Sequence, residues 1–243
     1  VSTYLLCGHA WRLRYIDRVH APTAPALVFG TAWHELTEQY LKTGEPLESL
    51  WPGAWSKALE RDATVDWSRE SAEDLQATAL RMLQAKPVVD LLSQVRNVFD
   101  PETCEIEKRV EMRVPGVPVP VIGYVDVITT DGVPGDFKTA SRMWSENKAG
   151  AEMQPLVYLA ALNQAGDNTH EWRFRHYVMS KTARPGAKVF MCQRSPGEVL
   201  NNLIPTIQNV WQGIQAQVFP KNTNTWKCSP KWCEYWQQCQ GSN

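Results

Sequence analysis

The stretch that decides the fold is GYVDVITTDGVPGDFKT, residues 123–139. Residues 121–129 are rich in β-branched side chains, which favour strands. Asp131-Gly132 is a strong turn signal, and residues 135–139 then return as a second strand. The stretch therefore predicts a β-hairpin with a loop over residues 130–132.

Polar side chains gather on one face of this predicted hairpin. With that loop, Asp126 lies opposite Asp136, and the two carboxylates project from the same face. Because side chains alternate along a strand, Lys138 shares the face of Asp136, whereas Phe137 points the other way into a core. Two carboxylates and an ammonium can hold a divalent metal beside a reacting phosphate. A surface hairpin with scattered charges is the alternative that the pattern alone leaves open.

The rest of the chain indicates an α/β protein. Apolar residues recur at helical spacing over 54–61 and 71–84, so residues 44–100 are predicted to form a helical subdomain before the sheet. Strands that are followed by a helix and a further strand indicate an α/β core, which we expect to be a single domain over 1–243. Other predicted helices span 2–19, 31–42 (introduced by Gly30), 149–164 and 198–217, and other predicted strands span 105–114, 171–180 and 188–193.

Composition excludes several classes of protein. The 243 residues are 43% hydrophobic, which permits a sizeable core. No run approaches the roughly 18 apolar residues of a membrane span, and the start has no signal-peptide pattern. A phosphate-binding loop of the Walker type is absent, so the chain is not itself a helicase motor. We expect a cytoplasmic protein of bacterial, archaeal or phage type that is not secreted and meets no membrane.

Charge limits how the chain would contact nucleic acid. The net charge is −1, so any DNA contact must come from local basic patches. Such clusters occur on the first predicted helix and around a Pro-Gly loop. A single cluster is most often a solvated face, but several around a cleft would contact phosphates. The candidate contacts are Arg12, Arg14, Lys181 and Arg184.

Two pairs of polar residues lie one helical turn apart. His34 precedes Glu38 by one turn, and a lone histidine at such a position is most often partly buried and paired with the acid. Gln154 and Tyr158 also face the same way. Their spacing fits a capping amide with a core tyrosine as well as it fits a functional pair.

The six cysteines fall into two kinds. Cys104 and Cys192 lie in apolar, strand-like contexts and are predicted to be buried. Cys228, Cys233 and Cys239 form a tight group near the C-terminus. Because no secretory feature is present, clustered cysteines more often bind metal than form disulfides.

Four kinds of motif, in order, resemble those of the PD-(D/E)XK nucleases. The hairpin pattern of Gly123, Asp126, Asp136, Lys138 and Thr139 resembles the core of that superfamily. Upstream, the segment from Gly30 to His34 resembles its helical histidine motif, and downstream Gln154 and Tyr158 resemble its Gln-x-x-x-Tyr motif. Cys7 together with Cys228, Cys233 and Cys239 resembles the split cysteine set of the iron–sulfur branch. That branch includes the RecB-like nuclease domain of AddB and the Cas-type nucleases of CRISPR adaptation, and the resemblance runs from Tyr4 to Cys239.

The resemblance implies a fold and a metal site. It implies a restriction-endonuclease-like central mixed sheet flanked by helices, with Mg²⁺ or Mn²⁺ as the catalytic metal. The implied ligands are His34, Asp126, Asp136 and the backbone carbonyl of Phe137, with Glu38 orienting His34. Lys138 would orient or deprotonate the attacking water, and Gln154 and Tyr158 would point toward the metal-bound water or the DNA backbone. A histidine ligand favours Mn²⁺ over strict Mg²⁺ dependence.

The same resemblance implies a second metal centre. Cys7 would complete a four-thiolate site with the cysteines of residues 226–240 and thereby join the two ends of the chain. A 4Fe–4S cluster is the expected occupant, with Zn²⁺ as the alternative. Four residues separate Cys228 from Cys233, where the family usually has two, so the identity of the metal stays open.

The function implied is a metal-dependent DNA nuclease. We expect an exonuclease that acts on single-stranded DNA or DNA ends, with a helicase or recombination protein as its partner. The alternatives are a structure-specific or CRISPR-adaptation-type endonuclease and a catalytically silent DNA-end clamp in a recombination complex. The presence of Asp126, Asp136 and Lys138 argues against the silent clamp.

Overall fold

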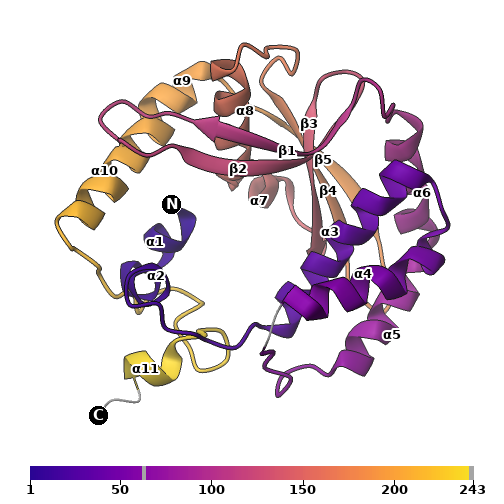
Figure 1. Ribbon diagram of the computed structural model, residues 1–243, viewed down its shortest axis with the longest axis horizontal. Coiled ribbons are helices and arrows are strands. Elements are labelled where there is room, and N and C mark those ends of the chain that lie inside the picture. The colour runs from indigo at the N-terminus through magenta and orange to yellow at the C-terminus, as the bar shows by residue number, and fades with distance from the viewer. Residues whose placement is uncertain (62–63, 241–243) are drawn as a thin grey trace.

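The computed structural model describes residues 1–61 and 64–240. Residues 62–63 of the predicted helical subdomain and 241–243 of the predicted domain lie outside the described residues. The centre of the molecule is a five-stranded mixed sheet with helices on both faces (Figure 1). The predicted α/β fold with a mixed sheet flanked by helices is thereby confirmed.

The strands follow one another across the sheet in chain order, β1-β2-β3-β4-β5. Only β3 and β4 are parallel, and the other three neighbouring pairs are antiparallel. The helix pair between β3 and β4 provides the long connection that a parallel pair requires. The strands are β1 (Glu105–Met112), β2 (Val121–Ile128), β3 (Pro134–Ala140), β4 (Arg173–Ser180) and β5 (Ala187–Gln193).

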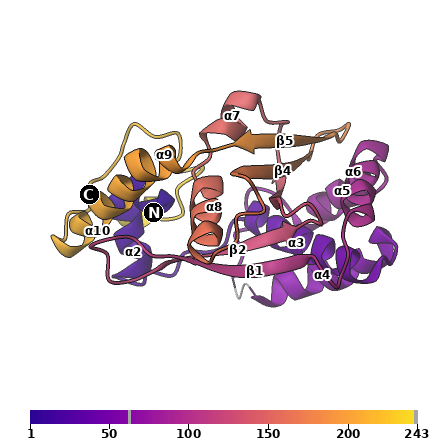
Figure 2. The same cartoon turned by 90° about the horizontal axis from the view of Figure 1, so that it is seen from above.

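One face of the sheet is covered by a layer of four helices. Phe137 of β3 and Tyr177 of β4 point into this layer, and their rings stack at 5.1 Å. The layer also contains stacked Phe29 and Trp33 on α3, both fully buried. Figure 2 shows this layer on one side of the strands, opposite α8 and α10. Its helices are α3 (Pro25–Thr43), α4 (Leu47–Arg61), α5 (Ala72–Leu83) and α6 (Lys86–Asn97).

The other face carries a second apolar core. Phe174 and Val178 of β4 and Phe190 of β5 contribute to it from the sheet. Leu159 of α8 and Leu203 complete it from the helices. The helices on this side are α7 (Glu146–Ala151), α8 (Gln154–Gln164), α9 (Pro196–Glu198), a π-helical turn over Val199–Leu203, and α10 (Ile204–Gln215).

The two ends of the chain lie together. Both views place α1 (Ser2–Leu6) and α2 (Gly8–Tyr15) beside the C-terminal segment that ends in α11 (Trp236–Gln240) (Figures 1 and 2). The Tyr4 hydroxyl donates to the Val218 carbonyl at 2.5 Å, and the His9 N–H donates to the Pro220 carbonyl at 3.2 Å. The N-terminal helices are therefore held against the segment that follows α10.

Three predicted helices have different boundaries in the structure. The helix predicted over 2–19 is broken at Cys7, which is extended. The helix predicted from residue 31 begins at Pro25, because a proline at the first helical position has the right φ and no N–H to leave unpaired. Gly30 therefore lies inside the helix rather than before it. The helix predicted over 149–164 breaks between α7 and α8, since Pro155 cannot continue a helix from Ala151.

Candidate active site

The candidate site lies where β2 and β3 separate. Their ladder contains only Val127↔Gly135 and Ile128↔Pro134, and the next pair in this register is Asp126 with Asp136. The strands stop pairing there, and the Asp126 carboxylate Oδ2 accepts the Phe137 N–H at 2.7 Å. A side chain thus replaces a ladder bond, and both acids remain at the opening between the strands.

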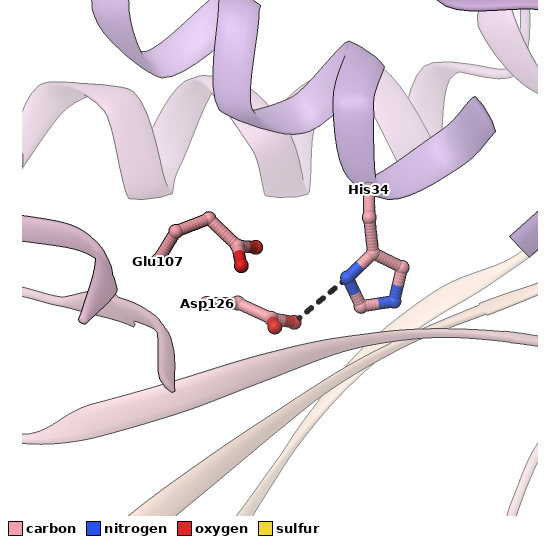
Figure 3. Close-up of side chains that lie close together, drawn as sticks. All are labelled: His34, Glu107 and Asp126. Atoms are coloured by element: carbon pink, nitrogen blue, oxygen red, sulfur yellow. Dashed lines mark ion pairs between the residues drawn. The ribbon is translucent and has the colours of Figure 1, made fainter. Parts of the chain in front are cut away.

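Three side chains from three elements converge at this opening (Figure 3). His34 comes from the middle of α3, Asp126 from β2 and Glu107 from β1. The His34 Nδ1 lies 3.2 Å from Asp126 Oδ2. One ligand atom from each of the three residues lies within 4.8 Å of the others. Imidazole and carboxylate donors at this separation fit a divalent cation such as Mn²⁺ or Mg²⁺.

Glu107 reaches this group through an unusual backbone conformation. Its φ is 51°, in the left-handed region, although it lies within a strand and is not a glycine. Ladder pairs flank the position at Ile106↔Val127 and Lys108↔Val125, so Glu107 faces Asp126 across the sheet. Such a conformation costs about 1–2 kcal/mol in a residue with a Cβ, and strain of this kind clusters at functional sites.

Asp136 is held by a different set of partners. Its Oδ2 lies 2.7 Å from the Lys138 ammonium, and its Oδ1 accepts the Gln154 amide at 2.8 Å. The same amide lies 2.9 Å from the Tyr158 hydroxyl. Gly123 permits this arrangement, because a Cβ there would overlap the Tyr158 ring. The first turns of α8 therefore place an amide and a phenol beside the acid of β3.

Burial and like charge perturb the titration of these groups. Burial, followed by the charge of Asp126, raises the pKa of Asp136 to about 6. Burial is also the main reason that the pKa of Glu107 is raised. Burial alone would lower the pKa of His34, but its hydrogen bond to Asp126 and the nearby acids outweigh it and raise that pKa. Nearby negative charge contributes to all three pKa shifts, and a bound cation would neutralise that charge.

The side chains open into one pocket of about 470 Å³. We call it the catalytic pocket, and its lining residues used below are Leu27, His34, Glu107, Asp126 and Lys138. The Lys138 side chain is 28% exposed, so its ammonium reaches the pocket while it pairs with Asp136. The lining of this pocket thus combines the possible metal ligands with the Lys138 ammonium.

Comparison with known protein families gives a match over nearly the whole chain. A family model described as the PD-(D/E)XK nuclease superfamily matches residues 1–240. The chain belongs to this superfamily. No curated protein matches the chain.

Solved structures related to this nuclease-superfamily chain are distant in sequence. A crystal structure from Eubacterium rectale, described as a "Putative exonuclease", is 10% identical with a TM-score of 0.58. The match covers 91% of this chain and 80% of that one, and at such low identity it shows the fold alone. A second structure, of SSO0001, is 13% identical over 99% and 96% of the two chains, with a TM-score of 0.37 that is too low to support a shared fold.

The group of possible metal ligands in this superfamily member shares His34 and Asp126 with the predicted set, which stays a prediction. Among the described residues, the group that can hold a metal contains Glu107 beside His34 and Asp126, whereas Asp136 is occupied by Lys138 and Gln154. The partner of His34 is Asp126 rather than the predicted Glu38, whose carboxylate pairs with Lys42. Phe137 lines the pocket, and its hydrogen bond to Asp126 is made through the N–H.

The cysteines divide as the sequence suggests. Cys104 and Cys192 are buried, as predicted. The other four, Cys7, Cys228, Cys233 and Cys239, line a single cavity between the N-terminal helices and the C-terminal segment. All six cysteines are free thiols in this structure.

The predicted DNA contacts lie in different surroundings. Arg12 pairs with Asp17 at 3.1 Å, and Arg184 is exposed. The Lys181 ammonium lies 5.0 Å from the centre of the Phe29 ring, and burial lowers its pKa. Arg14 lines a pocket beside the connection from α2 to α3. The described residues contain no helix that is both long and apolar enough to cross a membrane.

Proposed function

We propose that this chain is a metal-dependent deoxyribonuclease that degrades single-stranded DNA or DNA ends as an exonuclease. The observation that supports this most is the convergence of His34, Glu107 and Asp126 beside the Lys138–Asp136 ion pair. The chain belongs to a nuclease superfamily, so we assign this group of side chains to phosphodiester hydrolysis. The site then needs a cation, a water molecule and a phosphodiester.

Each residue has a part in this proposal. His34, Glu107 and Asp126 would hold Mg²⁺ or Mn²⁺, and when bound the metal would activate water and polarise the phosphoryl group. Asp136 fixes the Lys138 ammonium at 2.7 Å, which leaves its other protons free to bond the water or a phosphate oxygen. Gln154 keeps Asp136 in place, and Tyr158 in turn bonds Gln154. Burial raises the pKa of Tyr158 to about 12, so its hydroxyl stays protonated.

We also propose that the four cysteines of the terminal cavity bind a 4Fe–4S cluster, with Zn²⁺ as the alternative. Support comes from Cys7 and the three C-terminal cysteines, which line one cavity although they lie at opposite ends of the sequence. Four thiolates suit either metal centre. Such a site would persist in the cytoplasm, where thiols are kept reduced.

Cleavage of end-labelled DNA tests the proposed activity. Single-stranded and double-stranded substrates are incubated with Mg²⁺, with Mn²⁺ or with EDTA. We expect short products from single strands and from ends, in either metal and not in EDTA. Absence of cleavage of every substrate in both metals would support the silent DNA-end clamp instead.

Circular substrates separate the two nuclease alternatives. An exonuclease leaves covalently closed single-stranded circles intact and degrades the same sequence once it is linear. A structure-specific or CRISPR-adaptation-type endonuclease cuts the circle. A helicase or recombination partner would then supply the ends, because the chain has no nucleotide-binding loop of its own.

A further inference from the structure

A second pocket lies against the catalytic pocket. It has a volume of about 470 Å³ and is formed by the end of α2, the connection to α3, and Glu234–Tyr235 within the cysteine-rich segment. Figure 1 shows this connection running from the terminal helices to the start of α3. We call it the basic pocket, and its basic lining residues are Arg14, Arg18 and His20.

The two pockets meet at Leu27. This residue is in the first turn of α3 and lines both of them. Its side chain is 58% exposed, so it forms an apolar ridge between the two. A flexible chain with its scissile bond at the metal site would pass over Leu27 into the basic pocket.

The charges of the two pockets differ in sign. The catalytic pocket gathers carboxylates, whereas the basic pocket gathers two exposed arginines. Among the described residues, neither Arg14 nor Arg18 has a carboxylate within 4.0 Å, in contrast to Arg12 with its Asp17. The acid that lines the basic pocket, Glu234, lies 3.5 Å from Lys227 instead. The Arg14 guanidinium lies 5.6 Å from the centre of the Tyr15 ring, and neither arginine is neutralised by an acid, so both can bind an anion.

The basic pocket also contains a residue with an unusual backbone conformation. Arg18 has a φ of 52°, in the left-handed region that residues with a Cβ seldom adopt. The conformation belongs to the turn that leads from α2 into the connection. The residue in this conformation is one of the two arginines that line the basic pocket.

We propose that the basic pocket binds the single DNA strand beside the scissile bond, with Arg14 and Arg18 on its phosphates. This inference rests on the proposed function and adds the path of the substrate. Arginines bind phosphate through charge-assisted hydrogen bonds. The wall also contains Val19 and Pro22, which offer apolar contact to an unpaired base. A volume within the roughly 300–1,000 Å³ of small-molecule sites suits one splayed nucleotide rather than a stacked duplex.

Binding of single-stranded oligonucleotides tests this path. The affinity of a fluorescent ten-nucleotide thymidine oligomer is measured by anisotropy in Ca²⁺ over a series of salt concentrations. For the variant with both Arg14→Ala and Arg18→Ala, we expect at least a tenfold weaker affinity. Loss of two phosphate contacts also lowers the slope of log affinity against log salt by about 1.4, at about 0.7 per contact.

Two matched variants control for the loss of positive charge. Arg109→Ala removes a 49% exposed arginine that pairs with Glu111 on β1 and lies outside the basic pocket. Lys86→Ala removes an 83% exposed lysine that pairs with Asp90 on α6. We expect both to retain the parent affinity and salt slope. If Arg14 and Arg18 variants bind like these controls, the proposed path is wrong.

Two further measurements keep this inference separate from the proposed function. The parent is tested with Mn²⁺ on bis(p-nitrophenyl) phosphate, which is too small to span both pockets. If the parent hydrolyses this ester and the double variant binds DNA as the parent does, only the proposed path of the strand is wrong. If the parent cleaves neither the ester nor DNA, the proposed nuclease function is wrong. A double variant that loses affinity for duplex DNA but not for the single strand overturns the assignment of the occupant.

Discussion

At the scale of single residues, Glu107 combines a strained backbone conformation with a place in the candidate metal-binding group. We predict that Glu107→Ala and Glu107→Gly both weaken Mn²⁺ binding, because each removes a carboxylate from the group with His34 and Asp126. The glycine variant should be more stable than the alanine variant by about 1 kcal/mol, since only glycine adopts a φ of 51° without cost. Calorimetric Mn²⁺ titration and urea unfolding measure the two effects. Equal stability of the two variants would show that the position is unstrained.

Asp136 links stability to pH. Its pKa is raised from 3.8 to about 6, so the folded state of the metal-free protein favours the protonated carboxyl. The resulting contribution to the free energy of unfolding is fully present below pH 4 and is lost as the pH rises through 6. Asp136→Asn cannot ionise and should avoid this loss, which is at most about 3 kcal/mol for two pKa units. We predict that the stability of the variant relative to the parent increases from pH 4 to pH 7. If the free energies of unfolding of the parent and the variant, measured in urea, change with pH in the same way over that range, the pKa of Asp136 is not raised.

The residues of the site differ in how far the sequence could predict them. Asp126, Asp136 and Lys138 follow from one hairpin, whose turn chemistry fixes the register locally. Glu107 does not, because Glu105, Glu107 and Glu111 all lie on one alternating strand. Its selection depends on the pairing of β1 with β2 and on a left-handed φ, neither of which the local sequence encodes.

At the scale of elements, the contact between β2 and α8 positions the acid of β3. We predict that Gly123→Ala destabilises the protein by about 1–3 kcal/mol, because the added methyl group overlaps the Tyr158 ring. It should also lower cleavage, since Tyr158 supports the amide that bonds Asp136. Thermal unfolding and a DNA cleavage assay measure these effects.

A second substitution separates the steric effect from other causes. Tyr158→Leu removes the ring edge that the new methyl group would meet, so Gly123→Ala should cost less stability in that background. A double-mutant cycle with no coupling between the two positions would place the cause of the loss elsewhere.

The existence of the elements was easier to predict than their ends. Long periodic segments such as 71–84 gave a helix close to its observed bounds, Ala72–Leu83, which Ser71 caps. The helix that carries His34 begins six residues before the predicted start, because Pro25 can open a helix and Gly30 is tolerated inside it. The break at Cys7 lies next to residues that pack on distant parts of the chain, Gly8 on Pro220 and Trp11 on Phe219, and a local pattern does not report such contacts.

At the scale of the whole molecule, the chain is closed by contacts between its two ends. A Cβ at Gly8 would lie 2.7 Å from the Pro220 ring, and Trp11 stacks on Phe219 at 5.8 Å. These contacts bring Cys7 to the cavity that the three C-terminal cysteines line. A metal bound there would cross-link residues separated by more than two hundred positions. By the loop-closure argument, such a cross-link stabilises the fold by up to about 5 kcal/mol.

Removing single cysteines tests this closure. We predict that anaerobically purified protein is brown and carries about four irons per chain, as cubane ligation by four cysteines implies. Cys7→Ala should lose the colour as fully as Cys233→Ala, because both line the same cavity, and each should lower the unfolding temperature. Cys104→Ala and Cys192→Ala are the matched controls that should keep the colour, since both residues are buried in the apolar cores.

The outcomes of that experiment separate the metal from the closure. A colourless protein with one zinc would retain the cross-link and exclude the iron–sulfur cluster. Full metal content in Cys7→Ala would show that the two ends are not joined through the metal. Asp126 and Asp136 lie on the central sheet, away from this cavity, so Mn²⁺ binding at His34 and Asp126 should survive loss of the cluster in any fraction that stays folded. DNA binding should nevertheless weaken, because Tyr235 lines the basic pocket and lies between Cys233 and Cys239.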